Sequence, residues 1–174
     1  AKENIKTPSE KVAREMLKDV LLGTENKGKA IIVTTFSSHL ARLKTIVEMG
    51  KKLGRKVVFL GRSLNRYVKA AEDVGIVKFS NQVEIVAYAS KIKRKIKQIV
   101  KEGRGKYLIV CTGNQAEPGS VLTKMANGVF HFDFHHEDHV IFSCRTIPVE
   151  DNIKNREKLE NKLKSLGCRI FKEI

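Results

Sequence analysis

Short apolar runs rich in valine and isoleucine alternate with helical patterns along this chain of 174 residues, and this alternation restricts its fold more than any other feature. The runs predict strands over residues 29–36, 56–60, 83–88, 107–111, 139–144 and 169–171. Helical spacing fills the intervals, over residues 38–53, 63–74, 91–102, 121–126 and 152–166, after a first helix that we expect to begin at Thr7. Strands joined through helices are typical of a parallel sheet covered on both faces. We therefore expect an α/β fold with three layers, a mostly parallel sheet with helices on both faces, in a single domain over residues 1–174.

The charge balance favours a polyanionic partner. The net charge is +15, from 34 basic and 19 acidic residues, which suits nucleic acid and, less well, an anionic membrane surface. No apolar run is long enough for a membrane span or a signal peptide, so we expect no membrane partner. Cys111, Cys144 and Cys168 are odd in number and widely spaced, which predicts reduced thiols in a cytoplasmic protein.

Polar side chains follow four of the predicted strands. Ser37 and Ser38 follow the first, Arg62 and Ser63 the second, residues 112–117 the strand that ends at Cys111, and Arg145 the strand that ends at Cys144. Ligands of open parallel sheets bind outside the carboxyl ends of the strands. Hydroxyl, amide and guanidinium groups there suit phosphate and sugar contacts, although the same residues are also common as plain helix caps.

A strongly basic helix is expected over residues 91–101, and the loop behind it adds Arg104 and Lys106. Such a face could follow a phosphate backbone, where each neutralised phosphate adds salt-dependent affinity. A merely solvated face is the alternative. A membrane-bound face is less suited to this helix, because its aliphatic stripe lacks aromatic anchors.

Residues 130–139 concentrate histidine and carboxylate side chains and at first resemble a metal site. Phenylalanines at 130, 132 and 134 alternate with His131, Asp133 and His135. This alternation predicts a half-buried edge strand or hairpin. Three groups along one strand are nearly collinear and poorly placed to close a tetrahedral zinc shell, so we expect no metal here.

Four segments together, residues 30–42, 54–63, 111–118 and 140–148, resemble the β-CASP domain of RNase J in order and spacing. The most specific of them is the Thr-Gly-x-Gln-x-Glu-Pro block from Thr112 to Pro118. Within this block Ala116 stands where the family usually has glycine. Arg145 and Thr146 stand where bacterial members tend to have small residues, so the archaeal branch is the closer match.

The resemblance implies a parent protein that is a zinc-dependent ribonuclease, acting 5′ to 3′ and in some members also internally. In that family the β-CASP domain is inserted into a metallo-β-lactamase domain that holds two zinc ions. This chain has no His-x-His-x-Asp-His motif. We therefore expect a β-CASP domain excised from such a ribonuclease, without a cofactor of its own and not competent for catalysis alone.

The resemblance also implies partners and contact residues. The expected partners are single-stranded RNA and the metallo-β-lactamase domain of the parent chain, and a homodimeric parent is compatible with the family. Glu117 is expected to position its own loop by accepting backbone hydrogen bonds. The residues expected to contact RNA phosphate or sugar, with a terminal 5′-phosphate as one candidate ligand, are Ser37, Ser38, Arg62, Ser63, Gly113, Asn114, Gln115, Ser143 and Arg145.

Two other functions fit the residues without the resemblance. A self-sufficient Rossmann-like domain could bind a phosphorylated small ligand, but no nucleophile–base pair or phosphate-binding glycine motif supports an enzyme. A basic protein-interaction module could dock an acidic partner through the helix at residues 91–101.

Overall fold

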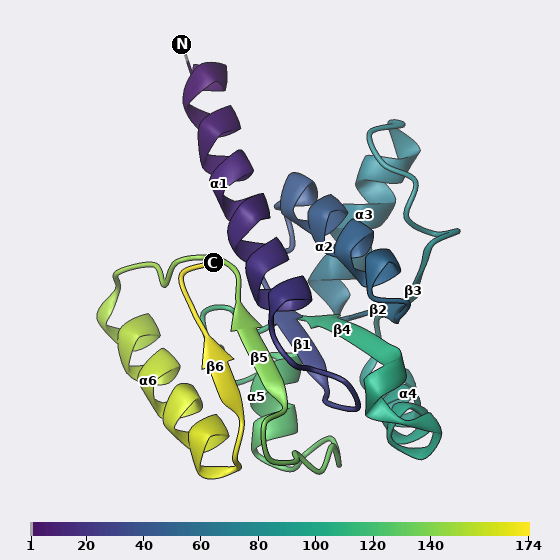
Figure 1. Cartoon of the computed structure of the whole chain (residues 1–174), viewed down its shortest axis with the longest axis vertical. Helices are drawn as coiled ribbons and strands as arrows, with labels where there is room; N and C mark the ends of the chain where they lie inside the picture. Colours follow the sequence, from purple (N-terminus) through teal and green to yellow (C-terminus); the bar gives the residue numbers. More distant parts are fainter. Residues whose placement is uncertain (1) are drawn as a thin grey trace.

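Six parallel strands form one sheet at the centre of the described part of the chain (Figure 1). The computed structural model describes residues 2–174, with side chains from Glu10 onward. The strands stand in the order β3-β2-β4-β1-β5-β6, and every neighbouring pair is parallel. Their bounds are β1 (Ile31–Thr34), β2 (Lys56–Leu60), β3 (Val83–Val86), β4 (Tyr107–Cys111), β5 (His139–Phe142) and β6 (Arg169–Phe171).

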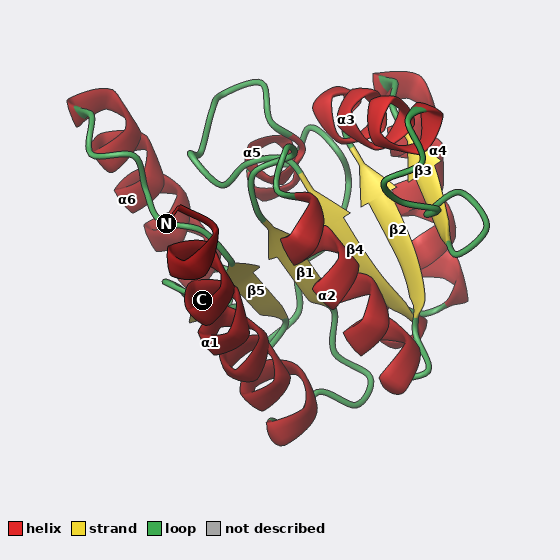
Figure 2. Ribbon diagram, turned by 90° about the horizontal axis from the view of Figure 1, so that it is seen from above, coloured by secondary structure: helices red, strands yellow, loops and turns green. Residues whose placement is uncertain are grey.

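Helices cover both faces of this sheet (Figure 2). One face packs against α1 (Lys2–Gly23), α2 (Leu40–Lys52) and α3 (Arg62–Asp73). The other face packs against α4 (Ala89–Glu102), α5 (Val121–Ala126) and α6 (Glu150–Ser165), and a short 3₁₀ helix, Arg104–Lys106, follows α4. The predicted three-layer α/β fold is therefore confirmed, and the sheet is parallel throughout rather than mostly parallel.

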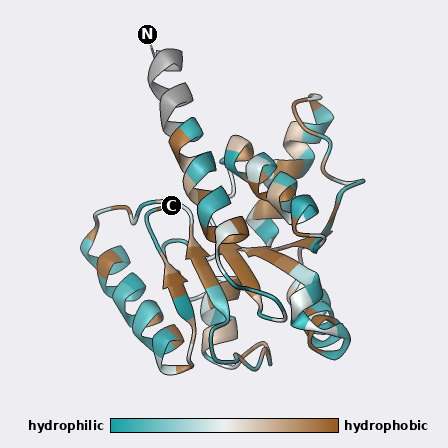
Figure 3. Cartoon of the chain, in the orientation of Figure 1, coloured by the Kyte–Doolittle hydropathy of each residue, from teal (hydrophilic) through white to brown (hydrophobic). Residues whose placement is uncertain are grey.

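Most strand residues are apolar, because the central strands β1, β4 and β5 are buried on both faces along their whole length. In β4, Leu108 and Val110 point into the core beneath α1, α2 and α3. Ile109 and Cys111 point into the core beneath α4, α5 and α6. Side chains on a strand alternate between faces, so a strand between two helical layers has no solvent-facing positions. Figure 3 shows the resulting pattern, with apolar strands inside and hydrophilic outer helix surfaces.

Helix α1 differs in part from its prediction. Leu17, Val20 and Leu21 are buried, whereas Val12 is 59% exposed and Met16 is 37% exposed. Ala13 takes the buried position in that turn instead. The predicted helix start at Thr7 is wrong, because α1 begins at Lys2; the side chains of its first residues, up to residue 9, lie outside the described part of the chain.

The predicted strand over Phe130–Phe134 is wrong, because residues 130–136 form an irregular segment outside the sheet. The alternation of burial is real: Phe130 and Phe132 enter the core shared with α4 and α5, and His131 is exposed. Within the segment, the rings of Phe132 and Phe134 meet edge to face, with their centres 4.9 Å apart. Burial at every second position therefore arises here without a strand ladder.

Candidate functional site

The chain connections open a crevice at the carboxyl ends of β1 and β4. These two strands are neighbours, but their connections diverge. From β1 the chain passes through α2 on one face to reach β2, whereas from β4 it passes through α5 on the other face to reach β5. Ligands of doubly wound sheets bind at such a switch point, because no connection covers the strand ends there.

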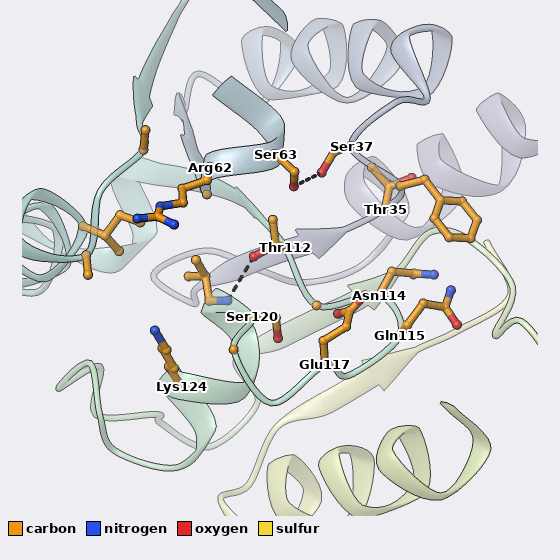
Figure 4. Close-up of a pocket in the computed structure, with 18 of the residues that line it drawn as sticks. Thr35, Ser37, Arg62, Ser63, Thr112, Asn114, Gln115, Glu117, Ser120 and Lys124 are labelled. Atoms are coloured by element: carbon orange, nitrogen blue, oxygen red, sulfur yellow. Dashed lines mark hydrogen bonds between the residues drawn. The ribbon is translucent and has the colours of Figure 1, made fainter. Parts of the chain in front are cut away.

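A cavity of about 520 Å³ occupies this crevice, and we call it the switch-point pocket (Figure 4). The ends of β1, β2, β3 and β4 all contribute to its wall. Arg62 and Lys124 lie at one end of the pocket, and the turn that carries Asn114, Gln115 and Glu117 lies at the other. Its remaining polar lining consists of Thr35, Ser37, Ser63, Thr112 and Ser120.

The first turn of α3 faces the pocket with unpaired backbone donors. The residue before α3 is Gly61, which has no capping side chain, and the first turn contains no acidic residue. The first hydrogen bond within α3 runs from the Asn65 N–H to the Gly61 carbonyl. The N–H groups of residues 62–64 therefore have no partner within the helix. Such donors, together with the positive end of the helix dipole, favour an anion.

The formal charges around the pocket also favour an anion. Arg62 is exposed, and Lys124 is partly exposed with its ammonium 5.6 Å from the centre of the Phe130 ring. Neither cation forms an ion pair with any of the described residues. Glu117 supplies the carboxylate of the lining, so the lining has a net positive charge and suits a ligand such as phosphate.

Two serines that the sequence places far apart meet at the rim. Ser37 follows β1 and Ser63 lies in the first turn of α3, yet their hydroxyl oxygens are 2.7 Å apart. One hydroxyl proton is used in this contact, and the other is free to be donated to a ligand. The helix predicted over residues 63–74 begins one residue earlier, at Arg62, and the Ser63 side chain pairs with Ser37.

Close packing of the loops after β2 and β4 requires glycine at two positions. Gly61 has φ 145°, and a Cβ atom there would lie 2.6 Å from Cγ2 of Thr112. Gly113 has φ 134°, and its Cβ would lie 2.7 Å from Cβ of Leu122. Both conformations disfavour L side chains, and both contacts are too short for a carbon atom. Glycine at these two positions lets the loop after β2 pack against Thr112 and the loop after β4 pack against α5.

Asn114 and Gln115 line the pocket, and their side chains also brace its wall. Both amides donate to the carbonyl of Arg145, at 3.2 Å and 3.0 Å. The Gln115 carbonyl oxygen accepts from the Ile147 N–H at 2.8 Å. Both side chains are almost fully buried, at 3% and 5% exposure. Their amides therefore hold the loop after β5 against the loop after β4.

Arg156 of α6 supports the same wall from behind. Its Nη1 donates to the Asn114 carbonyl and to the Thr146 hydroxyl, both at 3.0 Å. Its guanidinium carbon lies 3.7 Å from the centre of the Phe142 ring. Burial lowers the pKa of this guanidinium, and the nearby Glu160 carboxylate counteracts that effect. A buried cation thus fixes the backbone of the turn that faces the pocket.

The structure brings together six of the nine residues predicted to contact RNA. The six that line the switch-point pocket are Ser37, Arg62, Ser63, Gly113, Asn114 and Gln115. Ser38 is exposed beside the pocket but does not line it. Arg145 lies in a neighbouring depression next to α1. Ser143 is fully buried, because Arg42 of α2 closes over it and donates to its hydroxyl at 2.9 Å and to its carbonyl.

Lys124 is a pocket residue that the sequence reasoning missed. Ser120 caps α5 by accepting a hydrogen bond from the Thr123 N–H. Lys124 follows this cap by four residues, so it lies on the same side of the helix and turns back toward the loop. The spacing of four residues between Ser120 and Lys124 could have predicted that this lysine lies beside the loop. Glu117 was expected to accept backbone hydrogen bonds. Its main-chain carbonyl accepts one from the Ser120 N–H, whereas its side chain is exposed.

The other sequence features divide between surface and interior. On α4, Lys91, Lys93 and Arg94 are exposed as predicted, whereas Lys95 is buried and pairs with Glu84 at 2.8 Å. Among the described residues, no group of three or more His, Cys, Asp or Glu side chains is arranged to hold a metal. In the same part of the chain, every helix is too short or too polar to cross a membrane.

Comparison with known proteins agrees with this geometry. The family described as "Ribonuclease J, beta-CASP domain" matches residues 28–163. Ribonuclease J of Methanocaldococcus jannaschii is 47% identical over 96% of this chain, and that of Pyrococcus abyssi is 38% identical over 99% of it. Ribonuclease J of the bacterium Thermus thermophilus is 31% identical over 95% of the chain. The chain spans 37% and 38% of the length of the two archaeal relatives. The chain belongs to the β-CASP family of ribonuclease J, and the two archaeal proteins resemble it more than the bacterial one does.

Proposed function

We propose that this chain is the RNA-binding lobe of an RNase J-type ribonuclease and that the switch-point pocket holds a phosphate of single-stranded RNA. The observation that carries the proposal is the convergence of Arg62, Lys124 and the uncapped start of α3 on one cavity. A phosphate there receives charge from two side chains and hydrogen bonds from backbone N–H groups. A terminal 5′-phosphate is one candidate, because it carries more charge than a phosphodiester within the strand.

The lobe contributes binding and orientation, and no bond-breaking step is assigned to it. The two zinc ions that the family implies belong to a metallo-β-lactamase domain outside this chain. The described side chains do not fit such ions, because they include no suitable cluster of metal ligands. In the proposed complex Arg62 and Lys124 hold the phosphate, while the Ser37–Ser63 pair donates one hydroxyl proton to it. In this proposal the full-length ribonuclease carries out cleavage from the 5′ end and, in some cases, internal cleavage.

Replacing Arg62 with Gln tests the proposal, because it removes one pocket charge and keeps a long polar side chain. Binding of the chain to a 3′-labelled single-stranded RNA is measured by fluorescence anisotropy over a series of salt concentrations. Each lost phosphate contact lowers the slope of log K against log salt by about 0.7. We expect this reduction, together with weaker binding at every salt concentration.

Arg66→Gln is the matched control. Arg66 lies four residues further along the same helix, is exposed, and does not line the pocket. It therefore reports the effect of total charge alone. Equal slopes for Arg62→Gln and Arg66→Gln would contradict the proposal. Displacement of the RNA by an acidic peptide at equal charge and equal salt would instead favour a protein-interaction module.

A further inference from the structure

A second groove lies along the outer edge of the sheet, next to the switch-point pocket. We call it the β3-edge groove; its volume is about 390 Å³, and it lies between α3 and α4 beside β3. Ala87 lines both cavities, so the two lie next to each other. Tyr88 lies in the groove, and the Arg62 guanidinium carbon is 5.9 Å from the centre of its ring. A strand held at the pocket would reach this groove directly.

The groove has a strongly positive lining. Lys69 of α3 and both Lys91 and Arg94 of α4 line it, and all three are exposed. None of them forms an ion pair among the described residues. The carboxylate of the lining, Glu84, is already paired with Lys95 at 2.8 Å. The groove therefore offers three unpaired positive charges to a polyanion.

Tyr88 adds a feature that a purely electrostatic surface lacks. It is 58% exposed, although it sits at a position where the chain turns from β3 into α4 and the backbone is fixed. Its carbonyl accepts the Ile92 N–H at 2.8 Å, which holds the residue at the start of the helix. An exposed aromatic ring on a rigid backbone beside basic side chains is the arrangement that stacks unpaired nucleic-acid bases.

We propose that the β3-edge groove is a second RNA subsite, in which Tyr88 stacks on a base while Lys69, Lys91 and Arg94 contact the adjoining phosphates. This inference rests on the proposed function, since it extends the path of the same strand beyond the switch-point pocket. The pocket recognises a phosphate, and the groove recognises a base without regard to its identity. The ligand is single-stranded, because stacking on Tyr88 requires an unpaired base.

Two strands of equal length and charge separate the pocket from the groove. One is a 5′-phosphorylated oligouridine octamer, and the other is the same octamer with abasic residues. Their affinities for the chain are compared by anisotropy competition for wild type, Tyr88→Ala and Tyr88→Phe. We expect Tyr88→Ala to weaken binding of the oligouridine by about tenfold and to leave the abasic strand unchanged. Tyr88→Phe keeps the ring and should restore wild-type affinity.

Tyr67→Ala is the matched control, because Tyr67 is 43% exposed on α3 but lines neither cavity. Equal oligouridine affinity for wild type and Tyr88→Ala, with Arg62→Gln still weakening both strands, would overturn the second subsite and leave the pocket intact. Absence of binding to either strand by wild type would overturn both proposals. Tyr88-dependent binding of an acidic peptide, with RNA binding independent of Tyr88, would make the groove a protein site.

Discussion

Replacing Asp138 with Asn should destabilise the fold strongly, because this carboxylate joins three parts of the chain at the amino ends of the strands. Asp138 is completely buried. Its Oδ1 accepts from the Ala30 N–H at 2.9 Å. Its Oδ2 accepts from the His135 N–H at 2.7 Å and from Nη1 of Arg104 at 2.8 Å. Arg104 is itself only 7% exposed, so both charges of this ion pair are removed from water.

The loss of stability in Asp138→Asn is large because an asparagine side chain cannot accept all the hydrogen bonds that the carboxylate accepts. Its amide nitrogen accepts no hydrogen bond, so either the Ala30 N–H or the His135 and Arg104 donors would face an NH₂ group. Arg104 would also remain buried without a counter-charge. Breaking a buried ion pair on one side costs about 3–5 kcal/mol. For a chain of this size, that lowers the melting temperature by roughly 10 °C.

Urea unfolding followed by circular dichroism at neutral pH measures this loss. Arg104→Met and the double variant complete a thermodynamic cycle, in which removal of both charges should cost less than the sum of the two single changes. The coupling should exceed about 1 kcal/mol. A loss below about 1 kcal/mol for Asp138→Asn, or additive single changes, would refute the role assigned to this pair.

Two further changes test the loop after β4 and the buried thiols. Ala116 has φ 56°, in a region that costs a non-glycine residue about 1–2 kcal/mol. Ala116→Gly removes this strain but adds the entropic cost of glycine, so it should raise the free energy of unfolding, measured with urea, by about 0.5 kcal/mol. A decrease of more than about 1 kcal/mol would contradict this expectation. Burial raises the pKa of the Cys111 thiol to about 12, so the folded chain keeps a proton that the unfolded chain loses above its ordinary pKa. Stability should therefore fall as pH rises from about 9 toward 12, by up to about 1.4 kcal/mol per pH unit, and Cys111→Ala should reduce this slope in urea titrations at several pH values. An unchanged slope would contradict the assignment.

The sequence predicted the layered fold because most strand residues are apolar and the central strands β1, β4 and β5 are buried on both faces. The runs at residues 56–60, 107–111 and 169–171 match β2, β4 and β6 at both ends. Apolar patterning alone did not distinguish a strand from the irregular segment over residues 130–136, since alternating burial occurs in both. Asp138 fixes the end of that segment, because its carboxylate accepts a hydrogen bond from the His135 N–H.

The sequence identified the turns that form the candidate site, but it did not predict the order of the strands that brings these turns together. Polar residues at strand ends identified the turns, but the sequence does not show that β1 and β4 are neighbours whose connections diverge. The crevice depends on that order. Ser143 illustrates the same point: it follows a strand as the contact residues do, yet Arg42 from a distant helix covers it. Contacts between elements far apart in the chain decide which strand-end residues reach the pocket.

The most direct test of the pocket as an RNA site is a map of the backbone amides during titration with 5′-phosphorylated single-stranded RNA. In nitrogen-15 NMR spectra, the largest shifts should fall on Ser63, Gly113 and Lys124, which line the pocket. Amides at the opposite end of the sheet, such as Ala30 and His135, bond to buried Asp138 and should not move. Shifts spread evenly over exposed basic residues, with no concentration at the pocket, would contradict the account.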